Sequence, residues 1–238
     1  MQLFYDFHIH TCLSPCGDSD MTPNNAVNMA LIKGLNVIAI TDHNACGNAE
    51  AAMQVGKENG LIVLPGMEVE TCEEIHVVTL FETLAACRAM EEKVHSALPP
   101  IENKPAIFGE QWILDAEDNC IGEEKRMLVT ACSLSVYEVV EAVHALGGIA
   151  IAAHVDKSAY SVISNLGFMP PDLPFDAAEL SKNAAGKGWT DGDERLAGLV
   201  AIHSSDAHYL GDINEPEHIL EAKNNEIASI LDAIRTKR

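Results

Sequence analysis

Histidine and carboxylate side chains lie in short clusters along this chain, and most of the clusters follow an apolar segment. The first cluster is Asp6-Phe7-His8-Ile9-His10, in which one residue separates two histidines. On a strand, side chains two positions apart project to the same face, so both imidazoles can bind one metal ion. Taken alone, the pair is equally consistent with two surface histidines that bind nothing.

Three further clusters strengthen the metal interpretation, because each follows a run that is typical of a buried strand. His43 follows residues 37–40, His154 follows residues 149–153, and Asp206 and His208 follow residues 199–203. In a parallel α/β barrel the carboxyl ends of all strands lie on one face, where active sites are built. A metal ion also satisfies imidazoles and carboxylates that are costly to bury without partners. We therefore expect the clusters to converge on one metal site.

The number of candidate ligands indicates more than one ion, because a single ion takes only about four to six donors. We expect two or three divalent ions, with the carboxylate of Glu68 bridging two of them. Imidazole-rich sites with carboxylates favour zinc, manganese or iron over magnesium or calcium. The nine candidate ligands are His8, His10, Asp18, His43, Glu68, His76, His154, Asp206 and His208.

Strand-like and helical patterns alternate in the first part of the chain. Apolar runs predict strands over residues 3–7, 37–40 and 61–64, and helices are predicted over residues 22–33, with Thr22 as N-cap, and 48–59. This βαβαβ order predicts an α/β fold with a parallel sheet or barrel. Residues 68–81 differ, because a polar bend at Glu73-Glu74 predicts a hairpin that brings Glu68 and His76 together.

The strand pattern is lost between residues 82 and 147, where helices are predicted over residues 83–96 and 135–146. We interpret residues 82–147 as an inserted helical segment within a single barrel domain spanning residues 1–238, and we expect it to shape access to the barrel mouth. Beyond it, the sequence predicts strands over residues 149–153, 175–180 and 199–203. Helices are predicted over residues 159–166 and 226–235.

Acidic residues outnumber basic ones by 36 to 15, which gives a formal net charge of −21. Such a surface repels a phosphate backbone and lacks a basic patch, so we expect no long nucleic acid as a partner. A small phosphorylated substrate remains possible, because bound cations invert the local field. No segment approaches the ~20 apolar residues of a membrane span, and the N-terminus lacks the basic region of a signal peptide. The oligomeric state is not predicted.

Seven cysteines are scattered along the chain, an odd number without a Cys-X-X-Cys pair. This pattern does not suit a disulfide framework and indicates a reducing, cytoplasmic compartment. Cys12 and Cys16 lie in the loop after His10. They are either soft metal ligands or small buried thiols, and the second interpretation is favoured.

In order and spacing, the clusters resemble the motifs of the PHP (polymerase and histidinol phosphatase) family of metal-dependent phosphoesterases. The resemblance implies a distorted (β/α)7 barrel, here with a helical insertion, that holds three metals at the carboxyl ends of its strands. Asp18 is the loop ligand by analogy, since it lies four residues before the helix start, and Asp20 is the alternative. By that resemblance, the ligand groups are His8, His10, Glu68 and Asp206; Glu68, His76 and His154; and Asp18, His43 and His208.

The activity implied by the resemblance is hydrolysis of small phosphate esters by metal-activated hydroxide. Asp206 and His208 are the expected catalytic residues, with His208 near the leaving group. Lys182 and His203 follow strands and are candidates for substrate contact, although a plain exposed lysine and a plain strand-end histidine explain them as well. Two alternatives stay open, namely an amidohydrolase-like enzyme that cleaves C–N bonds and a non-catalytic metal-binding domain.

Overall fold

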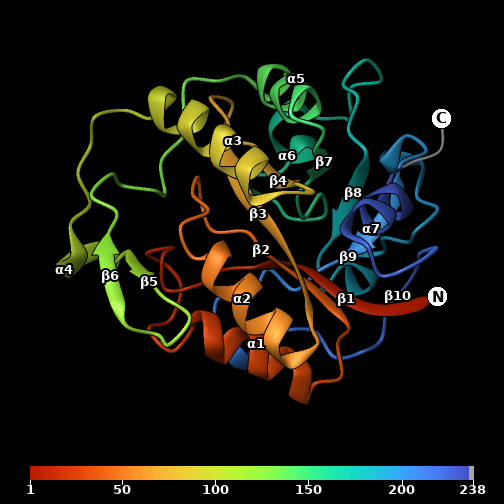
Figure 1. Cartoon of the computed structure of the whole chain (residues 1–238). Coiled ribbons are helices and arrows are strands. Elements are labelled where there is room, and N and C mark those ends of the chain that lie inside the picture. The colour runs from red at the N-terminus through yellow and green to blue at the C-terminus, as the bar shows by residue number, and fades with distance from the viewer. Residues whose placement is uncertain (236–238) are drawn as a thin grey trace.

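The computed structural model describes residues 1–235, and its main feature is a curled eight-stranded sheet (Figure 1). The strands follow the order β10-β1-β2-β3-β4-β7-β8-β9. Their bounds are β1 (Gln2–Ile9), β2 (Val37–Ile40), β3 (Ile62–Glu70), β4 (His76–Leu80), β7 (Ile149–Ala152), β8 (Ala177–Leu180), β9 (Val200–His203) and β10 (Ile219–Glu221).

Strand directions place the carboxyl ends of six strands at one end of the sheet. Strands β1, β2 and β3 pair in parallel, and so do β7, β8 and β9. Strand β4 is antiparallel to both β3 and β7, which confirms the predicted hairpin. Strand β10, which the sequence analysis missed, pairs antiparallel with β1.

The chain beyond β9 returns to β1 and brings the two ends of the sheet together. The backbone N–H of His10 donates to the carbonyl of Ala207 at 3.0 Å, and Ala207 forms a parallel bridge with Ile9. The result is the distorted barrel that we expected.

Helices cover the sheet between successive strands. They are α1 (Pro23–Ile32), α2 (Ala49–Asn59), α3 (Leu84–Ala97), α5 (Val136–Ala145), α6 (Val162–Leu166) and α7 (Ile227–Ile234). Each overlaps a helix predicted from the sequence. The hydroxyl of Thr22 accepts a hydrogen bond from the N–H of Asn25 at 3.2 Å, which caps α1 as expected. In the described part of the chain, no helix is long and apolar enough to cross a membrane.

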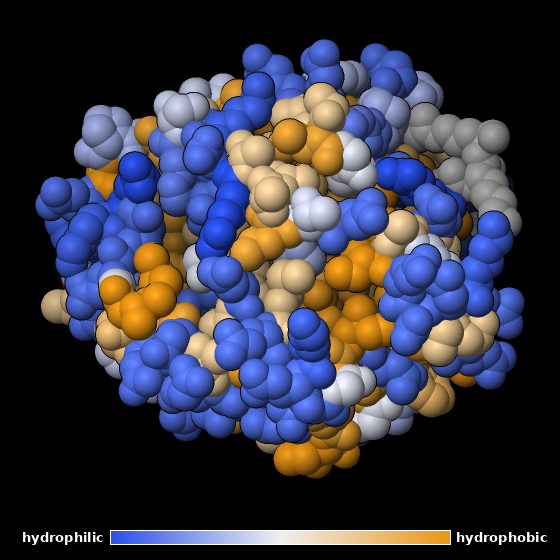
Figure 2. Space-filling model, in the orientation of Figure 1, coloured by the Kyte–Doolittle hydropathy of each residue, from blue (hydrophilic) through white to orange (hydrophobic). Residues whose placement is uncertain are grey.

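The segment from residue 82 to 147 is not wholly helical. Helices α3 and α5 pack against strands of the barrel, but the chain between them forms the short helix α4 (Pro105–Phe108) and an antiparallel pair, β5 (Trp112–Leu114) and β6 (Cys120–Glu123). This pair depends on distant partners, since the N–H of Trp112 donates to the carbonyl of Cys12. Local periodicity therefore could not reveal it. Figure 2 shows apolar side chains exposed over β5 and β6, with polar side chains around them.

Candidate metal centre

The carboxyl end of the barrel brings together eight of the nine predicted ligands. Their nitrogen and oxygen atoms form overlapping groups around the carboxylate of Glu68, which lies in β3 and is fully buried. The two oxygens of Glu68 lie 2.8–3.5 Å from nitrogens of five imidazoles, those of His8, His10, His43, His76 and His154. Asp206 is 3.2 Å from His10 and 3.4 Å from His8.

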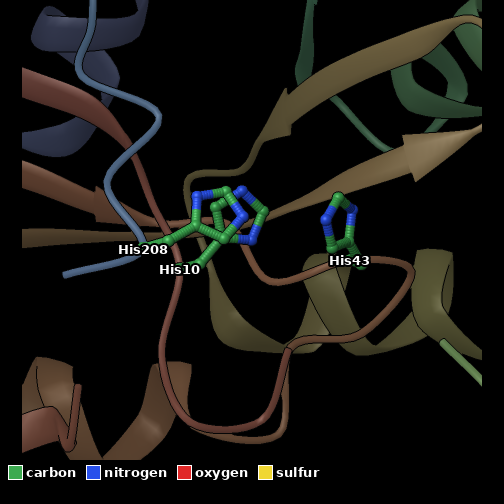
Figure 3. Close-up of side chains that lie close together, drawn as sticks. All are labelled: His10, His43 and His208. Carbon is green, nitrogen blue, oxygen red and sulfur yellow. The ribbon is translucent and has the colours of Figure 1, made fainter. Parts of the chain in front are cut away.

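Three sets of side chains have ligand atoms within 4.8 Å of one another. Two of them include Glu68, and the third consists of imidazoles alone. In Figure 3 the rings of His10 and His208 lie over one another, with His43 to one side. The sets are His8, His10, Glu68 and Asp206; His43, Glu68 and His76; and His10, His43 and His208.

Several of these atoms have no hydrogen-bond partner within the described residues. They are Nδ1 of His43, Oε2 of Glu68 and Nδ1 of His154, all buried. His43 Nδ1 and Glu68 Oε2 are 3.0 Å apart, but their geometry is not that of a hydrogen bond. Buried polar atoms without partners are costly. Divalent cations would satisfy them, so the residues present fit a metal centre.

The charges of the cluster suit metal binding, because its carboxylates stay ionised. Burial raises the pKa of Glu68, but the neighbouring imidazoles, led by that of His76, outweigh it and hold the pKa well below its usual range. Burial also raises the pKa of Asp206, and His8 and His10 outweigh that effect. Burial and nearby imidazoles lower the pKa of His10 well below its usual value, which keeps this ring neutral.

Unusual backbone conformations aim two of the side chains at the cluster. His154 has φ 28° and Asp206 has φ 54°, in a region that residues other than glycine seldom adopt. Each residue turns the chain sharply just after a strand. His154 Nε2 thereby reaches Glu68 at 3.1 Å, and Asp206 reaches His10. Strained backbone of this kind is concentrated at functional sites.

Asp6 and Asp42 hold the loops that carry the imidazoles. Asp6 accepts hydrogen bonds from the N–H groups of Ser205 and Asn214, and so fixes the segment that leads to Asp206. Asp42 accepts from the hydroxyl of Ser14 at 2.7 Å, and Ser14 Oγ lies 3.0 Å from His10 Nδ1. These carboxylates orient ligands without touching the cluster, as carboxylates around metal sites do.

Asp18 is the one predicted ligand that the structure does not bring into the cluster. Its carboxylate accepts a hydrogen bond from the N–H of Asp20 at 2.9 Å, and it belongs to none of the three sets. Asp20, the alternative, is exposed. Asp18 was chosen as the loop ligand because of its spacing from the start of α1. The direction of its side chain depends instead on the tight turns of this loop.

Lys182 and His203 also lie away from the cluster. They line a separate pocket of about 450 Å³. Lys182 Nζ donates to the carbonyl of Asp212, and His203 Nε2 is 2.8 Å from the carboxylate of Asp191. Both residues do follow strands, as predicted. A position just after a strand places a residue at one end of the sheet. It does not determine the direction in which the side chain points.

The cluster forms one wall of a pocket of about 330 Å³. The other wall comes from residues 157–160 and Lys187, and no residue of the segment 82–147 lines the pocket. Lys157 Nζ forms an ion pair with Asp206, and the ring of Tyr160 stacks on that of His76 with centroids 4.9 Å apart. The sequence pattern placed Tyr160 in a helix predicted over residues 159–166, whereas α6 begins at Val162, and it gave Lys157 no role.

Glu179 is a further residue that the sequence analysis did not assign. It lies in β8, and each of its oxygens is 3.0 Å from His8 Nδ1. It also accepts a hydrogen bond from the N–H of His154. A carboxylate on one imidazole nitrogen fixes the tautomer and directs the other nitrogen at a metal. The sequence did contain a signal for this role, because Glu179 is an acidic residue within the buried run 177–180.

We expect Glu179→Gln to weaken metal binding by roughly 10- to 100-fold, as loss of a ligand-orienting carboxylate usually does. Titration of the metal-free protein with zinc would measure the change. Glu141→Gln is the control, since Glu141 is exposed on α5. An unchanged zinc affinity in Glu179→Gln would contradict the orienting role.

Comparison with known proteins identifies the family. The family model described as the PHP domain matches residues 6–228 of this chain. The chain belongs to the PHP domain family. The structure gives this PHP protein a cluster of side chains that could hold several divalent ions.

Individual relatives of this PHP protein include nucleases. A 5'-3' exoribonuclease of Haemophilus influenzae is 27% identical over 189 residues, which cover 63% of this chain and 68% of that protein. Endonuclease Q, in complex with a 27-mer duplex, superposes with a TM-score of 0.67 at 20% identity over 98% of this chain. This chain spans only 56% of that nuclease. A protein from Bifidobacterium adolescentis, described as a metal-dependent phosphoesterase, has a TM-score of 0.62 at 19% identity, and 96% of each chain is covered.

These relatives overturn our expectation that a long nucleic acid is excluded as a partner. The expectation rested on the net charge of the whole chain. Net charge sums the entire surface, but binding at a pocket depends on the local field. Here two lysines line the pocket, and bound cations would add further positive charge.

Proposed function

We propose that this PHP protein is a phosphoesterase that cleaves a phosphodiester bond at the end of a nucleic-acid strand. Two or three ions of zinc, manganese or iron would be held by the cluster around Glu68. His8, His10, Glu68 and Asp206 would hold one ion, and Glu68 with His43 and His76 a second. His154, 3.1 Å from Glu68, would complete the second site.

The observation that carries the proposal is the pocket with ligand-type side chains on one wall and two lysines on the other. Its volume of about 330 Å³ lies near the lower limit of small-molecule sites, about 300–1,000 Å³. That space accommodates about one nucleotide, which favours a strand end over the middle of a duplex. The nuclease relatives support a nucleic-acid substrate.

The residues of the chain have distinct roles in such a reaction. Bound divalent ions would supply an activated water and would neutralise phosphate oxygens. Lys157 and Lys187 would bind the remaining oxygens, and Tyr160 offers a ring on which a base can stack. His208 Nδ1 donates to the carbonyl of Asp206 at 2.9 Å. The lone pair on Nε2 is therefore available to bind a metal ion, and the ring would lie beside the leaving group.

The direct test offers the metal-loaded protein single-stranded RNA and DNA oligonucleotides with a 5'-phosphate, each with zinc, manganese or iron. An aryl phosphate, nucleoside monophosphates and a panel of amides serve as competing substrates. We expect stepwise release of mononucleotides. Hydrolysis of the monophosphates alone would replace the proposal with a small phosphate ester, and hydrolysis of amides alone with an amidohydrolase activity. Metal binding without turnover of any substrate would indicate a non-catalytic domain.

Lys157→Met is expected to lower kcat/KM for the oligonucleotide by roughly 10- to 100-fold, because a hydrogen bond to a charged group contributes about 1.5–3 kcal/mol. Lys182→Met is the matched control, since Lys182 lines the other pocket. Steady-state kinetics of both variants would measure the difference. Equal losses in the two variants would argue against a phosphate-binding role for Lys157.

A further inference from the structure

A second pocket lies beside the pocket of the metal centre, where residues that follow β8 and β9 line it. Its volume of about 450 Å³ exceeds the 330 Å³ of the first pocket. Ala185 lines the second pocket and Lys187 the first, and in the same way Ser204 lines the second and Asp206 the first. Residues two positions apart are separated by at most about 7 Å, so the two pockets are neighbours.

Two imidazoles form a flat surface in the wall of the second pocket. The rings of His203 and His218 are stacked, with centroids 4.1 Å apart and an angle of 4° between their planes. Both residues line the pocket. His203 Nε2 is 2.8 Å from the carboxylate of Asp191, which holds the ring in place. Aromatic side chains of this kind are the surfaces on which nucleic-acid bases stack.

The wall of the second pocket also contains a hydroxyl that lacks a partner. Ser204 is only 2% exposed, and its Oγ has no hydrogen-bond partner within residues 1–235. Buried polar groups are nearly always paired, so an unpaired one in a pocket wall points to a ligand. A hydroxyl both donates and accepts, as the edge of a base requires.

The charges around the second pocket disfavour a phosphate group. Three carboxylates line it, those of Asp191, Glu215 and Glu217, together with one lysine, Lys182. Lys33 pairs with Glu215 at 3.0 Å, which still leaves the carboxylates in excess. An uncharged ring therefore suits this pocket better than a phosphate, whereas two lysines line the first pocket.

We propose that the second pocket binds the base of the nucleotide next to the one at the metal centre. The inference rests on the proposed function, because it places two nucleotides of the same strand. The linking phosphate would pass Lys187, at the end of the short helix η1 (Ala185–Lys187) between the pockets. The base would stack on the imidazole pair and bond to the hydroxyl of Ser204.

Lys182 has no part in this base contact. Its Nζ donates to the carbonyl of Asp212, and removal of its charge leaves the binding of an uncharged base unaffected. Lys182→Met therefore remains a fair control for phosphate binding in the first pocket.

Fluorescence of Trp189, which lines the second pocket, tests base binding without turnover. Trp112 is the only other tryptophan of the chain, so a Trp112→Phe background isolates the signal. Adenosine should quench it saturably, and ribose 5-phosphate, which lacks a base, should not. In this background His218→Ala should weaken adenosine binding roughly 10- to 100-fold, as loss of a stacking side chain does. His144→Ala, a control exposed on α5, should not change it.

Turnover tests whether the bound base belongs to the substrate strand. The metal-loaded protein would be given a dinucleotide with a 5'-phosphate and an analogue that lacks the second base. We expect a KM roughly 10- to 100-fold lower for the intact dinucleotide. His218→Ala should remove this difference and change kcat little, because the imidazole pair lies outside the metal centre.

The possible results separate this inference from the proposed function. Absence of quenching by adenosine, or quenching that is unchanged in His218→Ala, overturns the base pocket whatever the activity. Equal KM values for the two dinucleotides overturn the assignment to the strand. Adenosine binding that depends on His218, in a protein that hydrolyses no nucleic acid, overturns the proposed function and supports a base pocket. Circular dichroism establishes that each variant is folded.

Discussion

Glu68→Gln is expected to remove metal from the centre and to reduce hydrolysis by on the order of 10³-fold or more, beyond the effect of losing a single charge-stabilising group. Among residues 1–235, Glu68 is the one carboxylate whose oxygens reach five imidazoles, and two of the three ligand sets depend on it. Glutamine keeps the shape of the side chain but offers one neutral oxygen. The two ions that it would bridge lose their shared negative ligand.

Elemental analysis of the purified variant and its rate on the preferred phosphate substrate would measure both effects. Glu221→Gln is a suitable control, because Glu221 is exposed on β10 at the far end of the chain. Full metal content together with full activity in Glu68→Gln would contradict the bridging role and, with it, the centre as described.

Removal of the metal is expected to lower the melting temperature substantially. Each ion present at 100 times its Kd stabilises the folded state by about 2.7 kcal/mol. In a domain of this size about 1 kcal/mol shifts Tm by roughly 2–4 °C, so each ion should contribute roughly 5–10 °C. The effect arises because the buried donors of Glu68, His43 and His154 lose the cation that satisfies them.

Thermal unfolding followed by circular dichroism, with chelator and then with restored zinc, would measure this shift. The Glu68→Gln variant should show a much smaller response to chelator than the wild type. A wild-type Tm that is the same in chelator and in zinc would show that the cluster holds its buried carboxylate without ions.

The parts of the centre that the sequence predicted are those fixed by local geometry. The spacing of His8 and His10 and the polar bend between Glu68 and His76 each determine a relation within one strand or one hairpin. His43, His154 and Asp206 were also predicted, because each follows a strand and all such ends meet at one face of a barrel. The family motifs then placed these pieces in order.

Side chains in loops could not be placed in this way. Asp18 turns toward the N–H of Asp20, and its direction is set by a backbone hydrogen bond to the distant His208. Lys182 and His203 occupy strand ends as expected but turn into another pocket. Lys157 was missed because its role depends on a contact with Asp206, 49 positions away, which no local pattern shows.

The backbone bridge between Ile9 and Ala207 also bears on when the protein becomes active. His10 and Asp206 stand 196 positions apart, yet they share one face of the centre. Contacts of such long sequence separation form slowly, because closing the intervening loop costs entropy. A nascent chain that has emerged only as far as β9 still lacks Asp206 and His208. The metal centre therefore cannot be complete until the last segment has been made and has docked against the first strand.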